Sequence, residues 1–139
     1  MKLFQMLLIL GALISSSVQA GVVVIVSAGT AVDNLSQDDV SRIFLGKNKK
    51  FPNGEQAVPI NQDDGKPIRE EFNQKVCAKD AGQYRAYWSQ LIFTGKGTPP
   101  KDGGDDAAVK DLIAKNPNMI GYVNESVVDA SVKVVYRAQ

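Results

Sequence analysis

Residues Ala57 to Phe72 read AVPINQDDGKPIREEF and contain the clearest structural signals of the sequence. Its first four residues predict a short strand, and Asp63-Asp64-Gly65 predicts a turn. Pro67 suits the first turn of a helix, in which Ile68 and Phe72 recur at four-residue spacing. A strand that leads through a glycine turn into a helix is the building unit of α/β proteins.

Upstream of this unit, Val22 to Val26 is a run of β-branched residues with no polar alternation. Such a run is typical of a strand covered on both faces. Ser36 predicts a helix N-cap because Asp39 follows three residues later, and the helix is expected to end at Gly46. A strand and a helix therefore precede the central unit.

Downstream, Asp80 and Gln83 form a capping pattern that opens another helix. Its apolar stripe, which we interpret as core rather than as a ligand site, consists of Tyr84, Tyr87, Trp88 and Leu91. A loop is expected from Thr94 to Asp106, then a helix capped by Asp105-Asp106, and strands over 119–123 and 132–136. This order predicts an α/β fold with a mostly parallel sheet and helices on both faces.

The first 20 residues predict a secretory signal peptide. A positive start at Lys2 precedes an apolar run and a small-residue exit ending at Ala20. The apolar run is too short to span a bilayer. A lipid anchor is not expected either, because there is no cysteine near the cleavage point. We expect cleavage after Ala20, a periplasmic location, and a single domain over residues 21–139.

The composition excludes several classes of function. The chain has 16 basic and 15 acidic residues, and since Lys2 lies in the leader the remainder is formally neutral, so no nucleic-acid partner is expected. The absence of His removes the commonest general base and zinc ligand. Cys77, the only cysteine, is interpreted as a small buried hydrophobe rather than a reactive thiol. We expect no enzyme, cofactor or metal.

Two segments partly resemble ligand-binding motifs but do not match them. The segment Gly95-Lys96-Gly97-Thr98 does not have the spacing of a phosphate loop, and Pro99 rather than a helix follows it. The acidic segment from Asp102 to Asp106 lacks the alternating ligands of an EF-hand, so helix capping explains it better.

The segment from Ile60 to Arg69 has the strongest chemical content. It leads from the carboxyl end of a strand into a helix N-terminus, where free N–H groups and the helix dipole favour an anion. Ligands of open α/β sheets also bind at that end of the strands. This signal alone predicts a generic anion site.

Three blocks in this order resemble segments of the phosphate-binding proteins of ABC transporters: Leu35 to Lys47, Ala57 to Phe72 and Asn116 to Val123. The resemblance implies one lobe of a type II periplasmic binding protein, in which two lobes enclose phosphate and deliver it to a membrane permease. The family segment reads Arg-Ser-Asp-Gly-Ser-Gly-Thr-Ser. Here Gln62 replaces the Arg, and Lys66-Pro67-Ile68 replaces Ser-Gly-Thr.

The resemblance implies a periplasmic solute-binding component for phosphate or a related oxyanion, associated with an ABC permease. The expected phosphate-binding residues are Gln62, Asp64, Gly65, Lys66 and Arg69, with Ser27 and Thr30 from the same edge of the sheet. A second wall for the site would come from a homodimer or from another envelope protein. The alternative is an interaction module of the cell envelope that has lost ligand binding and uses the surface from Trp88 to Pro100.

Overall fold

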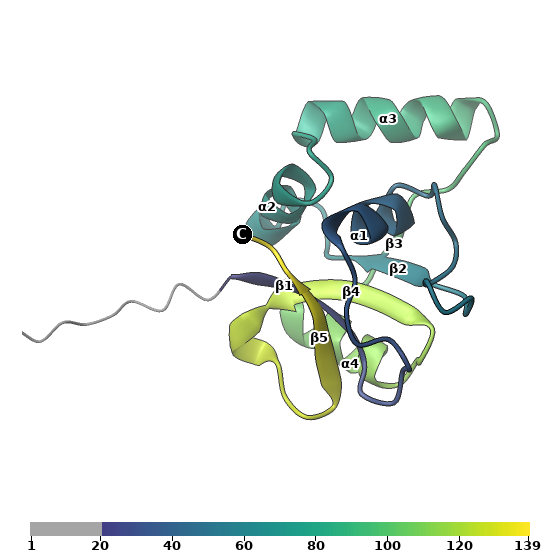
Figure 1. Ribbon diagram of the computed structural model, residues 1–139. Coiled ribbons are helices and arrows are strands. Elements are labelled where there is room, and N and C mark those ends of the chain that lie inside the picture. The colour runs from purple at the N-terminus through teal and green to yellow at the C-terminus, as the bar shows by residue number, and fades with distance from the viewer. Residues whose placement is uncertain (1–20) are drawn as a thin grey trace, which may run out of the picture.

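The computed structural model describes residues 21–139, so the predicted signal peptide lies outside the described residues. Within these residues the chain forms five strands and four α-helices (Figure 1). In order, they are β1 (Val22–Ser27), α1 (Gln37–Phe44), β2 (Val58–Asn61), α2 (Pro67–Lys75), α3 (Ala81–Phe93), β3 (Lys101–Asp102), α4 (Asp106–Ala114), β4 (Met119–Asn124) and β5 (Val132–Arg137), with the short 3₁₀ turn η1 (Glu125–Val127) after β4.

The strands form one mixed, mostly parallel sheet in the order β3-β2-β4-β1-β5. β2 runs parallel to β3 and β4, whereas β1 runs antiparallel to β4 and β5. Thus β1 alone opposes the common direction, and the predicted α/β class with a mostly parallel sheet is confirmed. The direction of β1 decides which of the predicted site residues can meet.

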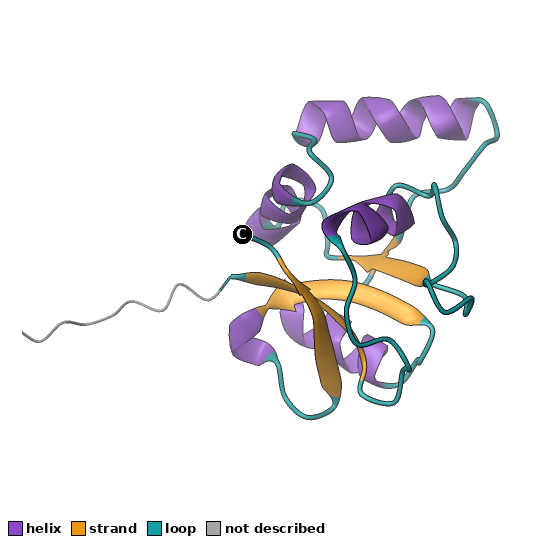
Figure 2. Cartoon of the chain, in the orientation of Figure 1, coloured by secondary structure: helices purple, strands orange, loops and turns teal. Residues whose placement is uncertain are grey.

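Helices cover both faces of the sheet, as predicted (Figure 2). Val24 and Val26 of β1 join a core cluster with α1 and α2, whereas Val23 and Ile25 join a second cluster with α4. All six residues of β1 are buried, because the alternating side chains of a strand point to opposite faces and both faces are covered. Burial on both faces therefore explains why β1 begins with an unbroken run of β-branched residues.

The helix α3 lies farther from the sheet, outside α1 and α2 (Figure 1). It starts at the predicted cap, where the Asp80 carboxylate accepts from the Gln83 N–H at 2.8 Å. Tyr84 and Trp88 are buried, and the Tyr87 hydroxyl donates to the Leu45 carbonyl at the end of α1 at 2.5 Å. The apolar stripe therefore faces inward, and its contacts hold α3 against the rest of the structure.

Two strand predictions need correction. β2 extends to Asn61 rather than stopping at Ile60, because Asn61 pairs with Asp102. The expected loop from Thr94 to Asp106 contains β3, a strand of two exposed residues. Its Lys-Asp sequence carries no apolar pattern, and only the neighbouring β2 makes it a strand. The ladder continues just beyond β3, where the Gly103 N–H donates to the Asn61 carbonyl at 2.7 Å.

The two ends of the described chain lie side by side (Figure 1). β1 pairs with β5, with Val23 opposite Arg137, and the Ala138 N–H donates to the Val22 carbonyl at 3.0 Å. Within residues 21–139, no helix has the length and apolarity needed to cross a membrane.

Candidate functional site

A groove of about 560 Å³ opens between the start of α2 and the inner side of α3. Its polar end is formed by the turn after β2 and the first turn of α2, and its opposite end by α3 and the loop that follows. The lining residues include Asp64, Gly65, Lys66, Arg69, Glu70 and Asn73 on one side, and Tyr84, Arg85, Trp88, Ser89, Ile92 and Pro99 on the other.

The local sequence explains how the polar end forms. Gly65 has a φ of 85°, a left-handed conformation that glycine adopts without strain. Pro67 then occupies the first position of α2, and Lys66, the N-cap residue, makes no side-chain capping bond. The start of α2 therefore faces the groove without a capping side chain, which leaves its positive dipole end available to an anion.

Arg69 projects from the first turn of α2 toward the end of β2. Its Nη1 donates to the Gln62 carbonyl at 2.9 Å and forms an ion pair with Asp102 Oδ1 at 2.8 Å. The guanidinium also lies over the Tyr84 ring, 5.6 Å from its centroid. The side chain is only 15% exposed, so Arg69 joins α2, β2, β3 and α3 while it lines the groove.

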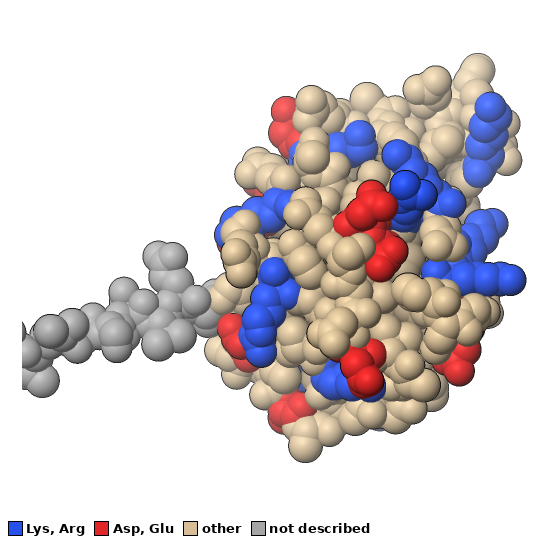
Figure 3. All heavy atoms as spheres, in the orientation of Figure 1, with Lys and Arg blue, Asp and Glu red and all other residues tan. Residues whose placement is uncertain are grey.

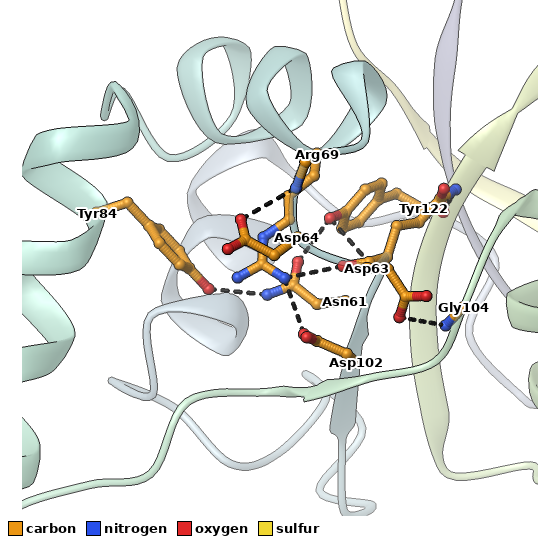
Figure 4. Close-up of polar contacts among 10 residues, drawn as sticks. Asn61, Asp63, Asp64, Arg69, Tyr84, Asp102, Gly104 and Tyr122 are labelled. Atoms are coloured by element: carbon orange, nitrogen blue, oxygen red, sulfur yellow. Dashed lines mark hydrogen bonds and ion pairs between the residues drawn. The ribbon is translucent and has the colours of Figure 1, made fainter.

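A chain of hydrogen bonds leads from the sheet to the groove (Figure 4). The Gln62 N–H donates to the Tyr122 hydroxyl at 3.2 Å, and this hydroxyl donates to Asn61 Oδ1 at 2.6 Å. Asn61 Nδ2 then donates to the Tyr84 hydroxyl at 2.8 Å. Tyr84 has no acceptor for its own hydroxyl hydrogen among residues 21–139, so the chain ends in a donor at the groove wall.

Burial keeps this donor protonated. It raises the pKa of the Tyr84 phenol above its usual value, and the Asn61 hydrogen bond and the positive charge of Arg69 offset only part of the increase. Burial likewise raises the pKa of Tyr122. Both hydroxyls therefore remain neutral hydrogen-bond donors over the physiological pH range.

Four predicted residues, Asp64, Gly65, Lys66 and Arg69, lie together on the groove. Two of their backbone N–H groups already donate to acceptors within the same turn. The Gly65 N–H donates to Asp64 Oδ1 at 3.1 Å, and the Lys66 N–H donates to the Asp63 carbonyl at 3.3 Å. The first distance is within the usual range and the second is slightly long for a hydrogen bond, and both contacts lie at the surface.

Gln62 lies elsewhere. Its side chain is buried and donates to Asp106 Oδ1 at 2.5 Å and to the Tyr122 carbonyl at 3.1 Å. It points into the interior because side chains alternate along the extended backbone, and the neighbouring Asn61 faces Tyr84. Gln62 reaches the groove only through its carbonyl, which holds Arg69.

Ser27 and Thr30 do not join the groove, and the expectation that they share its edge of the sheet is wrong. β1 is antiparallel to β4, so its carboxyl end lies beside the amino ends of β4 and β5. There the Ser27 hydroxyl donates to the Ala114 carbonyl at 3.1 Å, and the Thr30 hydroxyl donates to the Pro117 carbonyl at 2.7 Å. Both hydroxyls hold the turn between α4 and β4.

Sequence reasoning missed four residues at this site: Tyr84, Arg85, Trp88 and Asp102. Tyr84 and Trp88 belong to the stripe that was interpreted as core, and they are indeed buried. The available signal was the polar group that each aromatic side chain carries, since a buried Tyr or Trp normally needs a partner. Arg85, next to Tyr84, carried no distinguishing pattern.

The cysteine and the acidic loop serve structure. Burial raises the pKa of Cys77 to about 12, so the thiol stays protonated and unreactive. Asp105 caps α4 by accepting from the Ala108 N–H at 3.0 Å. Within the described part of the chain, no three acidic or thiol side chains gather closely enough to hold a metal ion.

The fold is similar to part of the fold of phosphate-binding proteins of ABC transport. A structure from Clostridium perfringens, assigned as a phosphate ABC transporter substrate-binding protein and solved with bound phosphate, matches with a TM-score of 0.67 and 23% identity. An ABC-type phosphate transport receptor from Vibrio cholerae matches with a TM-score of 0.65 and 15% identity, and PstS from Borrelia burgdorferi with 0.62 and 11%.

Each match covers 83% of this chain but only 44%, 45% and 46% of the respective structures. The chain thus spans a little under half the length of the proteins it resembles. No protein-family model matches the sequence. These similarities show the fold, and the structures that share it are binding proteins.

Proposed function

We propose that this chain is a periplasmic solute-binding component that takes phosphate or a related oxyanion in the groove between α2 and α3, without catalysing a reaction. The observation that carries the proposal is the Tyr84 hydroxyl at the end of the hydrogen-bond chain, which accepts from Asn61 but whose own hydrogen has no acceptor among residues 21–139. It shares the groove with Lys66, Arg69 and Arg85. An oxyanion offers the acceptors that these donors need.

Each groove residue has a role in this proposal. Asp64 accepts from a protonated oxyanion, as only a ligand with a proton can donate to a carboxylate. Gly65 and Lys66 turn their backbone N–H groups from their surface contacts with Asp64 and Asp63 to the ligand. Lys66 and Arg69 supply charge, and Gln62 acts indirectly by fixing Arg69. Ser27 and Thr30 have no part in the site.

Transport supplies the cellular context of the proposal. Residues 1–20 would direct export, and the similar structures are described as phosphate receptors of ABC transport. A single lobe leaves one side of the anion in water, where high dielectric weakens each contact. An ABC permease or another envelope protein would provide the second wall.

Titration calorimetry with the exported form, residues 21–139, tests the proposal. We expect phosphate to bind, and Tyr84→Phe to weaken binding about tenfold or more, because a hydrogen bond to a charged group contributes about 1.5–3 kcal/mol. The control is Tyr136→Phe, since among residues 21–139 the Tyr136 hydroxyl donates only to Gln37, at 3.5 Å, and Tyr136 does not line the groove. Absence of heat with millimolar phosphate would rule the proposal out.

The second candidate, an envelope interaction module, is favoured by an apolar corner at the end of α3. There Ile92 is 54% exposed and Phe93 92% exposed. Lys96 lies at this end of α3, where its N–H donates to the Leu91 carbonyl at 2.9 Å. Lys47 follows Gly46, which approaches the Trp88 ring of the same helix. Figure 3 shows basic side chains gathered over this edge of the molecule.

The lysines near the apolar corner also affect whether two copies of the chain would associate there. Like charges would face each other if two copies met there, so we expect an acidic partner to cover Phe93 and the protein itself to remain a monomer. Sedimentation velocity at tens of micromolar protein, with and without phosphate, checks this prediction. A dimer that Phe93→Ser dissociates would contradict it and assign the second wall to another copy of the chain.

A further inference from the structure

The groove is larger than an inorganic anion requires. Its volume of about 560 Å³ lies within the range of pockets that hold organic molecules of several functional groups. The proposed oxyanion contacts, from Asp64 to Arg69, occupy only one end. The rest of the groove runs along α3 as far as Ile92 and Pro99.

Trp88 lines the groove and carries a polar group without a hydrogen bond. The residue is 4% exposed, and its Nε1–H is buried without a hydrogen-bond acceptor among the described residues. Buried polar groups nearly always have a partner, so an orphaned indole N–H calls for an explanation. An acceptor atom on a bound ligand would provide one.

The orientation of the indole favours a ligand on the groove side. Gly46 and Gly97 approach the Cη2 and Cζ3 edge of the ring, which is occupied by the chain itself. The nitrogen edge instead faces the Tyr84 hydroxyl. Its N–H contact with that hydroxyl lowers the pKa of the phenol against the larger effect of burial, but the contact does not reach hydrogen-bond geometry. The Trp88 N–H and the Tyr84 hydroxyl thus lie next to each other, on two residues that both line the groove.

The chemistry changes from one end of the groove to the other. At the α2 end the lining is charged, whereas at the far end it consists of an indole, Ile92, Pro99 and the small polar Ser89. Apolar and aromatic walls with a few directed polar groups are typical of sites for the carbon skeleton of a ligand. Bare phosphate has no part that would use them.

We propose that the preferred ligand is a phosphate monoester, whose phosphoryl group binds at the Asp64 to Arg69 end and whose organic substituent lies along Trp88, Ile92 and Pro99. This inference rests on the proposed function, because it places the phosphoryl group at the same anion site. The ester oxygen or a substituent oxygen accepts from the Trp88 N–H.

The test compares inorganic phosphate with phenyl phosphate by titration calorimetry. We expect phenyl phosphate to bind at least tenfold more tightly and to change the fluorescence of Trp88, the only tryptophan in the chain. The variant Ser89→Phe fills the far end and should abolish this advantage while phosphate affinity stays unchanged. Gln90→Phe is the matched control, since the adjacent Gln90 is exposed and does not line the groove.

The outcomes separate this inference from the proposed function. If neither anion binds, the proposed function fails and the inference fails with it. If phosphate binds but phenyl phosphate binds no more tightly, the anion site stands and the ester inference is overturned. An ester advantage that survives Ser89→Phe also overturns it, because the substituent would then lie outside the groove.

Discussion

Replacing Phe72 with alanine is expected to lower the free energy of unfolding by about 3–5 kcal/mol, the usual cost of removing a buried aromatic ring. Phe72 is fully buried and stacks on Tyr122, with ring centroids 3.9 Å apart and an interplanar angle of 6°. Phe44 meets it edge-on at 4.7 Å. The substitution therefore leaves a cavity where α1, α2 and β4 join.

Urea unfolding followed by Trp88 fluorescence measures this loss. The matched control is Phe93→Ala, the same truncation at a residue that is 92% exposed, which should change stability by no more than about 0.5 kcal/mol. Equal effects of the two substitutions would contradict the packing described for the core. A loss confined to Phe72→Ala would support it.

Replacing Asp106 with alanine is expected to cost about 2–3 kcal/mol, although the residue begins a surface helix. Its Oδ1 accepts from the buried Gln62 amide at 2.5 Å and from the Asn124 N–H at 3.1 Å. Hydrogen bonds to a charged acceptor are stronger than average, and removal of the acceptor leaves one N–H of the buried Gln62 amide without a partner, while the other still donates to the Tyr122 carbonyl. The negative charge at the start of α4 is lost as well.

The control lies on the same helix. Asp111 forms an exposed ion pair with Lys115 at 2.9 Å, and Asp111→Ala should change stability by less than about 0.5 kcal/mol. Asp106→Asn keeps one acceptor oxygen and should fall between the two alanine variants in thermal unfolding. If Asp106→Ala were as mild as Asp111→Ala, the hydrogen bonds to Gln62 and Asn124 would have no energetic importance.

Helix starts were predictable because their causes are local. Ser36 accepts from the Asp39 N–H at 3.0 Å, and the Asp80 cap also forms as the sequence indicated. The turn through Gly65 into Pro67 forms for the same reason. Each depends on residues within four positions of one another, which is the range over which a sequence pattern is informative.

The features that the sequence patterns did not predict depend on residues that are far apart along the chain. The direction of β1 follows from its pairing with β4, about 100 residues away, and no local pattern encodes it. This is why Ser27 and Thr30 were assigned to the wrong edge. The direction of the Gln62 side chain likewise depends on Asp106. The donor role of Tyr84 was hidden because burial alone explained its position in the stripe.

The pairing of β1 with β5 brings Gly21 and Ala138 to one point on the surface, where the Ala138 N–H bonds to Val22. A domain whose ends meet can be inserted into a loop of another protein with little disturbance to either partner. Residues 21–139 are therefore suited to insertion into a loop of another protein. Placed within a fluorescent protein through short linkers at this point, the lobe would couple any ligand-induced shift of α3 to an optical signal.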